Sequence, residues 1–368
     1  MSKIIRVLHT EWSNGWGGQE IRIVNEMKAL REKGVVVYLA CRKLSIINQK
    51  AIENNIKVFE LPFKGNLDIV TLCSLIHIIK KNSINIVNTH SGKDTWVGGI
   101  AAKLTGAKFI RTRHISNKIN TSRLNFINEI ADFIFTTGET VKVDMIKNNR
   151  INFNKIKSIP TGVDSDIFDP ELYDRDKSRL KYNLKSDELV IGIVAVLRDS
   201  KRHDNFLKIA KQLIYDFPEK KFRFLIVGEG PMREQIENLI DGLNLNKVVT
   251  MLGHIENIPE LMSSLDVFLF TADRHEGVPQ VLIQALLMNI KTISSNDGST
   301  ADLYNENNFL ISKPSFEALY ENTKILIQNI DEDNLAEESR EFIANSFSQK
   351  IATKKILSIY IKLVQVDA

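Results

Sequence analysis

The chain has 368 residues, of which 43% are hydrophobic and 26% charged, and its formal net charge is +4, which predicts a globular protein of about two domains with buried cores. Its two cysteines, Cys41 and Cys73, show neither a disulfide framework nor a metal-ligand spacing, which indicates a reducing compartment. No segment has the roughly 18 uninterrupted apolar residues of a membrane span, and the N-terminal segment lacks the apolar region of a signal peptide, so we expect a cytoplasmic protein that contacts a membrane at most peripherally.

Short runs rich in β-branched residues alternate with amphipathic segments along the first half of the chain. After the first run, Ile21, Val24 and Met27 lie on an apolar stripe at helical spacing, and Gly34 ends that helix. Such alternation predicts a parallel sheet covered on both faces. The strands expected in this half are residues 4–9, 35–40, 57–61, 84–90, 108–114 and 133–138.

The second half repeats this alternation after a turn-rich connector, residues 159–170. Its expected strands are residues 189–197, 222–230, 248–254, 267–272 and 291–295, and a last amphipathic helix follows them. We therefore predict an α/β protein of two Rossmann-like, doubly wound domains that meet near residue 168.

Charge is divided unevenly between the two halves. Residues 1–168 carry 25 Lys and Arg against 14 Asp and Glu, whereas the remaining residues carry 24 against 31. The basic first half indicates an anionic ligand, although a solvated basic surface would give the same count. Nucleic acid is disfavoured as a partner because no basic run is interleaved with aromatic residues.

Three loops that follow expected strands have the composition of anion-binding turns, and ligands of open parallel sheets bind beyond the carboxyl ends of strands. Gly17 and Gly18 precede the first helix, and Gly228 ends a strand, so each suits either a close approach of a ligand or an ordinary tight turn. Arg198 and Lys201 follow another strand, where they suit either a grip on a diphosphate or a solvated loop.

The segment HEGVPQVLIQAL, residues 275–286, places a carboxylate and an amide near the start of one helix. Gly277 and Pro279 suit a loop that gives way to a helix, with Pro279 in its first turn. Glu276 and Gln284 are then about 12 Å apart along the axis, comparable to the distance between the sugar and the ribose of a nucleotide sugar. The alternative is a buried helix in which Gln284 is bonded to the backbone.

Two histidines, His90 and His114, follow neighbouring strands of the first half. A lone histidine is most often structural, but two at adjacent strand ends favour a position beside an interdomain cleft. Asp164 and Asp166 form a D-x-D, which is able to hold a divalent cation beside a diphosphate. Because this pair lies in the turn-rich connector, we predict that it holds no metal.

Together, these segments resemble the retaining family 4 glycosyltransferases of the GT-B architecture, over nearly the whole chain and in the family's order. The resemblance implies two Rossmann-like domains facing across a cleft, with a helix at residues 347–368 crossing back onto the domain of residues 1–168 and leaving residues 169–346 as the donor domain. The stretch EWSNGWGGQE, residues 11–20, is similar to members that build lipopolysaccharide or related surface glycans. The matching segments are GGQE (17–20), TRH (112–114), IPTGVDSDIFDP (159–170), LRDSK (197–201), VGEGP (227–231) and EGVPQVLIQA (276–285).

The resemblance also implies roles for single residues. Glu276 would contact the donor sugar, and Arg198 and Lys201 would stabilise the departing nucleoside diphosphate in place of a metal, so no cofactor is expected. His114 would lie under the donor sugar, near the acceptor. The other donor-binding residues would be Gly17, Gly18, Gly228, Gly277, Val278, Pro279, Gln284 and Gly298, and the acceptor-side residues would be His90, Lys93 and Arg113.

Three positions depart from the family pattern. Gln284 stands where a glutamate normally holds the ribose hydroxyls, and since hydrogen bonds to charged groups contribute about 1.5–3 kcal/mol against roughly 1 for neutral ones, donor affinity falls about tenfold. Asn289 replaces a glycine after the helix, and asparagine tolerates the left-handed conformation that this position requires. Asp302 replaces a glutamate in the loop that would bring Gly298 near the diphosphate.

The leading hypothesis is a metal-independent retaining glycosyltransferase that moves one sugar from a nucleotide sugar to a glycan or lipid-linked glycan, with an anionic acceptor at the inner face of the membrane. One alternative is a non-catalytic protein of the same fold that binds a nucleotide sugar or a glycan, which Gln284 favours. A sugar-nucleotide epimerase, which needs no acceptor, and a metal-dependent transferase that uses the connector D-x-D are further alternatives.

Overall fold

The computed structural model describes residues 4–114, 119, 126–274, 277–304, 309–331 and 335–365, with the backbone alone for residues 335–338. The chain forms two compact units: unit 1 consists of residues 1–162 and 349–368, and unit 2 of residues 163–348. The division falls at Gly162 rather than at residue 168, because the Val163 amide donates to the Phe347 carbonyl (3.2 Å) and holds the connector on unit 2.

Unit 1 is built on a parallel seven-stranded sheet in the described part of the chain, with the order β3-β2-β1-β4-β5-β6-β7. The strand order reverses between β1 and β4, so ligands are expected at the carboxyl ends of these two strands. The strands are β1 (Arg6–Glu11), β2 (Val36–Cys41), β3 (Lys57–Glu60), β4 (Ile86–Thr89), β5 (Lys108–Arg113), β6 (Phe133–Thr136) and β7 (Ile156–Ser158).

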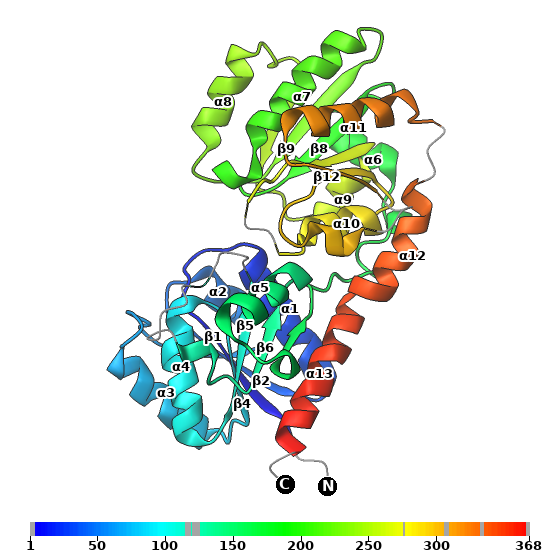
Figure 1. The fold of residues 1–368 in the computed structure, drawn as a ribbon. Helices are drawn as coiled ribbons and strands as arrows, with labels where there is room; N and C mark the ends of the chain where they lie inside the picture. Colours follow the sequence, from blue (N-terminus) through cyan, green and yellow to red (C-terminus); the bar gives the residue numbers. More distant parts are fainter. Residues whose placement is uncertain are drawn as a thin grey trace. The chain divides into compact units, whose positions relative to one another are not determined.

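Helices cover both faces of this sheet (Figure 1). On one side α1 packs against α2 and α13, and on the other α3 packs against α4. The helices of unit 1 are α1 (Gly18–Glu32), α2 (Ile46–Glu53), α3 (Ile69–Lys81), α4 (Gly92–Thr105), α5 (Glu139–Asn149) and α13 (Gln349–Gln365), with short 3-10 turns at Phe126–Asn128 and Phe153–Lys155.

Unit 2 has a parallel sheet of six described strands in the order β10-β9-β8-β11-β12-β13, which reverses between β8 and β11. Its strands are β8 (Leu189–Val194), β9 (Phe222–Val227), β10 (Val249–Gly253), β11 (Val267–Phe270), β12 (Lys291–Ser295) and β13 (Leu310–Ser312). Its helices are α6 (Arg175–Lys181), α7 (His203–Asp216), α8 (Arg233–Gly242), α9 (Ile258–Ser263), α10 (Gln280–Leu287), α11 (Phe316–Gln328) and α12 (Leu335–Phe347), with 3-10 turns at Pro170–Leu172, Asp199–Lys201 and Thr300–Leu303.

The expectation of a single last helix at residues 347–368 was wrong in its start, because Ser348 separates α12 from α13. Ser348 and Val163 form an isolated bridge at this point. From Gln349 onward α13 belongs to unit 1 and lies along α1, where it buries Ile356 and Tyr360 (Figure 1). Gly162 allows this approach, since a Cβ there would lie 2.6 Å from Cα of Gln349.

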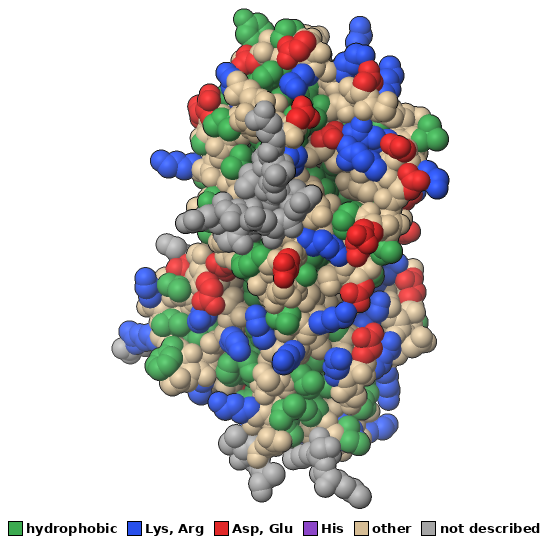
Figure 2. Space-filling view, turned by 90° about the vertical axis from the view of Figure 1, so that its right-hand side faces the viewer, with side chains coloured by type: hydrophobic (Ala, Val, Ile, Leu, Met, Phe, Trp, Pro, Cys, Tyr) green, Lys and Arg blue, Asp and Glu red, His purple; other side chains and the backbone are tan. Residues whose placement is uncertain are grey.

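The surface of unit 1 is rich in cationic side chains, as its composition predicts. Over unit 1, in the lower part of Figure 2, Lys and Arg side chains are spread among few Asp and Glu side chains. Unit 1 also exposes apolar groups at the start of α3, where Leu67 just before the helix and Ile69 and Val70 in its first turn are 86%, 72% and 65% exposed. Within the described residues, no helix has the length and hydropathy that would let it cross a bilayer.

Candidate functional site

The loops after β8 and β11 of unit 2 are joined to one another at the point where the strand order reverses. The Thr271 hydroxyl donates to the Lys201 carbonyl (2.7 Å), and the Asp273 amide donates to the Ser200 carbonyl (3.0 Å). The Arg202 guanidinium adds an ion pair with the Asp273 carboxylate (2.6 Å). These bonds fix the backbone of residues 200–202 where an α/β sheet binds its ligand.

Arg198 and Lys201 both lie in this fixed loop, as the sequence predicts. Arg198 precedes the 3-10 turn Asp199–Lys201 and its side chain is exposed. The Lys201 side chain is half-buried, and its ammonium lies 5.4 Å from the ring centroid of Phe270. The loop thus presents one guanidinium and one ammonium three residues apart in the chain, a set suited to an anionic ligand with several oxygens.

The glycine turn after β9 packs directly against the same loop. A Cβ on Gly228 would lie 2.0 Å from the Ala195 carbonyl oxygen, and one on Gly230 would lie 2.5 Å from the Leu197 carbonyl oxygen. Gly228 also has a φ of +134°, a backbone conformation that residues other than glycine rarely adopt. Gly228 therefore lets the turn after β9 approach the backbone that carries Arg198. A contact between Gly228 and the donor stays a prediction.

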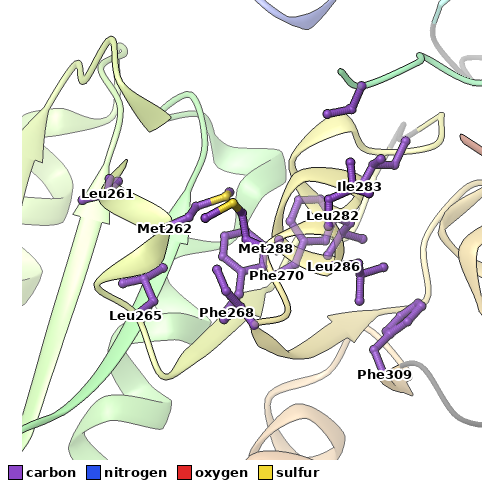
Figure 3. Packing of buried hydrophobic residues seen from close by; sticks show 14 of the residues in the cluster. Leu261, Met262, Leu265, Phe268, Phe270, Leu282, Ile283, Leu286, Met288 and Phe309 are labelled. Atoms are coloured by element: carbon purple, nitrogen blue, oxygen red, sulfur yellow. The ribbon is translucent and has the colours of Figure 1, made fainter. Parts of the chain in front are cut away.

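The helix α10 begins at Gln280, so Pro279 is its N-cap and lies one residue before the first turn in which we expected it. The predicted donor-sugar residue Glu276 lies outside the described residues, whereas Gly277 and the buried Val278 and Pro279 are described. Figure 3 shows one face of α10 packed on the sheet, where Leu282 and Leu286 lie beside Phe270 of β11.

Gln284 is half-buried, and none of the hydrogen bonds found among the described residues involves its side-chain amide. The alternative in which this amide is bonded to the backbone is thus not supported. Met288 follows α10, and Asn289 then has a φ of +54°, which confirms the left-handed conformation expected there. Gly298, after β12, has a φ of +56° and lies in the loop before the 3-10 turn that contains Asp302.

In unit 1, three histidines line up across the strands at the corresponding edge of the sheet. His9 Nδ1 lies 2.9 Å from His90 Nε2, and His90 Nδ1 lies 2.9 Å from His114 Nε2. His9 and His90 are buried and His114 is partly buried. Burial is the main cause that lowers the pKa of all three, to about 3 for His9 and well below the ordinary value for the other two. All three imidazoles are therefore neutral near pH 7.

A second buried polar cluster lies beside the histidines, at the ends of β1, β4 and β5. The Glu11 carboxylate accepts from the hydroxyl of Ser91 (2.7 Å) and from the amide of Gln19, and Arg111 donates to the Ser91 carbonyl (2.7 Å). Asp94 caps α4 by accepting from the Ser91 amide (2.8 Å). Burial, with the nearby charge of Glu11, raises the pKa of Asp94 to about 7.

Sequence reasoning missed His9, Glu11, Asp94 and Arg111. The signal for the first two was present in the run LHTE, since polar residues at the end of an otherwise apolar strand must find partners when they are buried. Asp94 was quoted only as part of a loop, although its place three residues after Ser91 is a capping-box pattern.

The remaining predicted residues of unit 1 occupy the ends of α1, α4 and β5. Gly17 is the N-cap of α1, with extended backbone, and its amide already donates to the Glu20 carboxylate (3.0 Å). A Cβ on Gly18 would meet nothing within 4 Å. Lys93 is exposed and its ammonium lies 3.9 Å from the ring centroid of Trp12. Arg113 is partly buried, and burial together with the charge of Arg111 lowers its pKa to about 10.

The connector D-x-D forms a turn. The Asp164 carboxylate accepts from the Asp166 amide (3.0 Å), which is the local bond expected of such a sequence. Among the described residues, no group of three or more His, Cys, Asp or Glu side chains is arranged as a metal site.

Comparison with known proteins places these features in a family. An Escherichia coli protein named UDP-Gal:alpha-D-GlcNAc-diphosphoundecaprenol alpha-1,3-galactosyltransferase is 26% identical over 383 residues, which cover 98% of this chain and 97% of its own length. A glycosyltransferase from Rickettsia africae has the same fold, with a TM-score of 0.89, 23% identity and coverage of 98% of this chain and 99% of its own. Anabaena HepE, solved in complex with UDP-glucose, superimposes with a TM-score of 0.82, 15% identity and coverage of 96% and 99%.

The family models agree with these relatives and together match most of the chain. Residues 16–167 match Glycosyltransferase Family 4, and residues 174–349 match Glycosyl transferases group 1. The similar solved structures share the two-sheet GT-B fold that the strand orders of both units display. The chain therefore belongs to the family 4, group 1 glycosyltransferases of the GT-B fold.

Proposed function

We propose that this glycosyltransferase moves a sugar from a nucleoside-diphosphate donor to a lipid-linked or polymeric glycan, with retention of the anomeric configuration and without a divalent metal. The observation that carries the proposal is the loop after β8, in which Arg198 and Lys201 stand on backbone tied to the loop after β11. Two fixed cations at a strand-order reversal suit a diphosphate leaving group, because they stabilise the charge that develops as the sugar departs.

UDP-sugars are the proposed donor class. HepE has been solved with UDP-glucose, and the Escherichia coli relative is named for a UDP-galactose donor. The Gln284 amide, which makes no hydrogen bond found among the described residues, is assigned to the ribose hydroxyls, and Glu276 is assigned to the hydroxyls of the sugar. The amide accepts from a hydroxyl without the gain of a charged acceptor, so we expect weaker donor binding than a glutamate would give.

The proposed reaction breaks the bond between the anomeric carbon and the diphosphate oxygen and forms a bond from that carbon to the acceptor oxygen on the same face. The leaving diphosphate takes the proton of the acceptor hydroxyl, so the charge is balanced within the two substrates. In this proposal Arg198 and Lys201 hold the diphosphate, and the neutral imidazole of His114 is assigned to a hydroxyl of the sugar. These side chains bind and orient the reactants rather than exchange protons with them.

The acceptor we propose is anionic and lipid-linked. The Escherichia coli relative is named for an acceptor with a diphosphate on undecaprenol. The surface of unit 1 carries Lys64 near the exposed apolar residues at the start of α3 and Lys80 and Lys81 at the other end of this helix, a combination that favours binding to an anionic membrane surface. Flotation with vesicles of anionic or neutral lipid tests this contact, and equal binding to both would contradict it.

Transfer assays test the proposal as a whole. With UDP-sugars and a lipid-diphosphate acceptor, Arg198→Ala and Glu276→Ala should lower turnover by roughly 100-fold or more, whereas Arg233→Ala, which removes a surface guanidinium on α8, should leave turnover unchanged. Nuclear magnetic resonance of the product gives the anomer, and an inverted product would refute retention. Loss of activity in EDTA that added Mg²⁺ restores would refute metal independence. Binding of a UDP-sugar without turnover on any acceptor would instead support the non-catalytic alternative.

A further inference from the structure

The three histidines of unit 1 form one continuous hydrogen-bonded line across three neighbouring strands. His9 lies on β1, His90 directly follows β4 and His114 directly follows β5. The first two rings are stacked at 5.2 Å between centroids, and the second two lie 5.1 Å apart. Each contact joins an Nδ1 to an Nε2 at 2.9 Å, so both nitrogens of His90 are bonded to a neighbouring ring. The three rings therefore do not converge on one point, as the ligands of a metal ion would.

Neutral imidazoles can make both bonds in only two ways. Each ring has one N–H and one lone pair, so a bond needs a donor nitrogen facing an acceptor nitrogen. If His9 donates from Nδ1, then His90 must donate from Nδ1 and His114 must carry its proton on Nδ1. In the reverse direction all three rings carry their proton on Nε2. The tautomer of one ring therefore fixes the tautomers of the other two.

The closed end of the line selects between these two states. Nε2 of His9 is buried, and none of the described residues makes a hydrogen bond with it. In the reverse direction this atom would be a buried, unpaired N–H, which folded proteins rarely tolerate, whereas in the forward direction it is only an unpaired lone pair. At the other end of the line, no bond to Nδ1 of the partly buried His114 is found in the described residues. This atom is not one of the buried atoms that lack a partner, so it is accessible to solvent or to a ligand.

Burial, the largest cause, keeps the rings in the neutral state on which this choice depends, and nearby positive charge adds to it at two of them. After burial, the charges of Arg22 and Arg111 lower the pKa of both His90 and His114, and Arg113 adds to the effect on His114. The backbone of His114 is held as well, since the Thr137 hydroxyl donates to its carbonyl (2.9 Å). The ring that ends the line is thus fixed both in place and in protonation.

We infer that His9 and His90 are positioning residues that hold His114 in the Nδ1–H tautomer, so that His114 offers a neutral N–H donor at the carboxyl end of β5. The ligand that this group recognises is an uncharged oxygen acceptor, such as a hydroxyl of the donor sugar; that assignment of the ligand rests on the proposed function, whereas the tautomer does not. The line is no proton conduit to solvent, because it ends at the buried Nε2 of His9.

Nitrogen-15 resonance of protein labelled at histidine tests the inference without any substrate. The free wild-type protein at pH 7 should show three neutral rings protonated at Nδ1, the His114 signal being assigned by its loss in His114→Gln, and the exposed His77 serves as a reference ring. A charged ring, or an Nε2–H tautomer at His114, would overturn the inference. Neither outcome depends on whether the chain transfers a sugar.

Variants of His90 separate positioning from mere packing. In His90→Phe the donor to Nε2 of His114 is lost, so His114 should populate the Nε2–H tautomer, and kcat with a UDP-sugar should fall by roughly fivefold, the effect of losing one neutral hydrogen bond, with little change in KM. His90→Gln, whose amide can donate to His114, should restore the tautomer and most of the rate. In His9→Phe the buried Nε2 of His90 becomes the closed end of the line, so His114 should keep the Nδ1–H tautomer. If His90→Phe lowers the melting temperature but leaves the His114 signals unchanged, His90 is only a packing residue and the inference fails. Should His90→Phe not fold, the wild-type spectrum still decides.

Discussion

Replacement of Gly228 with alanine is expected to damage the loop that carries the two cations, although residue 228 itself has no side chain to lose. The new Cβ would lie 2.0 Å from the Ala195 carbonyl oxygen and 2.9 Å from its carbon, so the backbone after β8 has to move. It would also hold alanine at a φ of +134°. Together, left-handed strain and overpacking cost about 2–4 kcal/mol, which lowers the melting temperature of a domain of this size by roughly 5–15 °C.

Two other glycines separate these causes. Gly34→Ala keeps the strain of a positive φ (+81°) but meets no atom within 4 Å, so it should cost only about 1 kcal/mol. Gly242→Ala, at the end of α8, has neither the strain nor the clash and should be neutral or slightly stabilising. We therefore expect Gly228→Ala to be the least stable of the three variants, Gly34→Ala to be intermediate and Gly242→Ala to be the most stable.

The distribution of tryptophan makes the assay specific to each unit. Trp12, Trp16 and Trp96 all belong to unit 1, so tryptophan fluorescence follows that unit while circular dichroism follows both. Gly228→Ala should lower the transition seen by circular dichroism and weaken UDP binding in calorimetry. A Gly228→Ala protein as stable as Gly242→Ala, with unchanged UDP affinity, would refute the idea that this turn supports the cationic loop.

Gln284→Glu should tighten UDP binding about tenfold in calorimetry, because a charged acceptor replaces a neutral one; an equal gain from Gln235→Glu, on the exposed face of α8, would show that net charge alone acts. Tyr360→Phe removes the hydroxyl that accepts from Asn88 (3.3 Å) and should cost unit 1 about 1 kcal/mol in urea unfolding followed by fluorescence; an unchanged midpoint would contradict this. Burial lowers the pKa of His9 to about 3 and lowers those of its two partners, so below about pH 6.5 the unfolded chain takes up three protons that the folded state does not. Asp94, whose pKa burial raises to about 7, takes up one proton in the folded state over the same range, so the stability of unit 1 should fall below pH 6.5 by roughly 3 kcal/mol per pH unit. A flat fluorescence-detected stability between pH 7 and pH 5 would refute the neutral state of the histidines.

The fold was predictable because its strands are buried on both faces and therefore read as continuous apolar, β-branched runs. Each of the eleven expected runs overlaps a strand: residues 267–272 contain all of β11, whereas residues 4–9 begin and end two residues before β1. The strands β7 (IKS) and β13 (LIS) were missed because three residues at the end of a sheet carry too little pattern. The break at Ser348 was missed because both flanking segments are amphipathic helices, so periodicity continues through it.

The candidate site was predictable where one residue acts through its own position in a loop. Arg198 and Lys201 follow β8 directly, and Asn289 has the left-handed backbone expected after α10. It was not predictable where residues act as pairs. His9 has no unusual local sequence, and its importance comes from the pairing of β1 with β4, which brings it beside His90, 81 positions away in the chain. Such contacts are set by strand register, which a single sequence does not reveal.

The acidic residues near the cationic loop explain why Arg198 keeps its charge available. Asp273 and Asp204 pair with Arg202, and Asp199 pairs with Arg274. With these three carboxylates neutralised by other guanidinium groups, none of the ion pairs found in the described residues engages Arg198. Because Arg202 and Arg274 pair with these carboxylates, the carboxylates compete less with an anionic ligand for Arg198. It follows that removing Arg202 should weaken diphosphate binding without any contact to the ligand, because Arg274, which pairs with Asp273 (3.0 Å) as well as with Asp199, would then be left to neutralise both carboxylates beside the loop that carries Arg198.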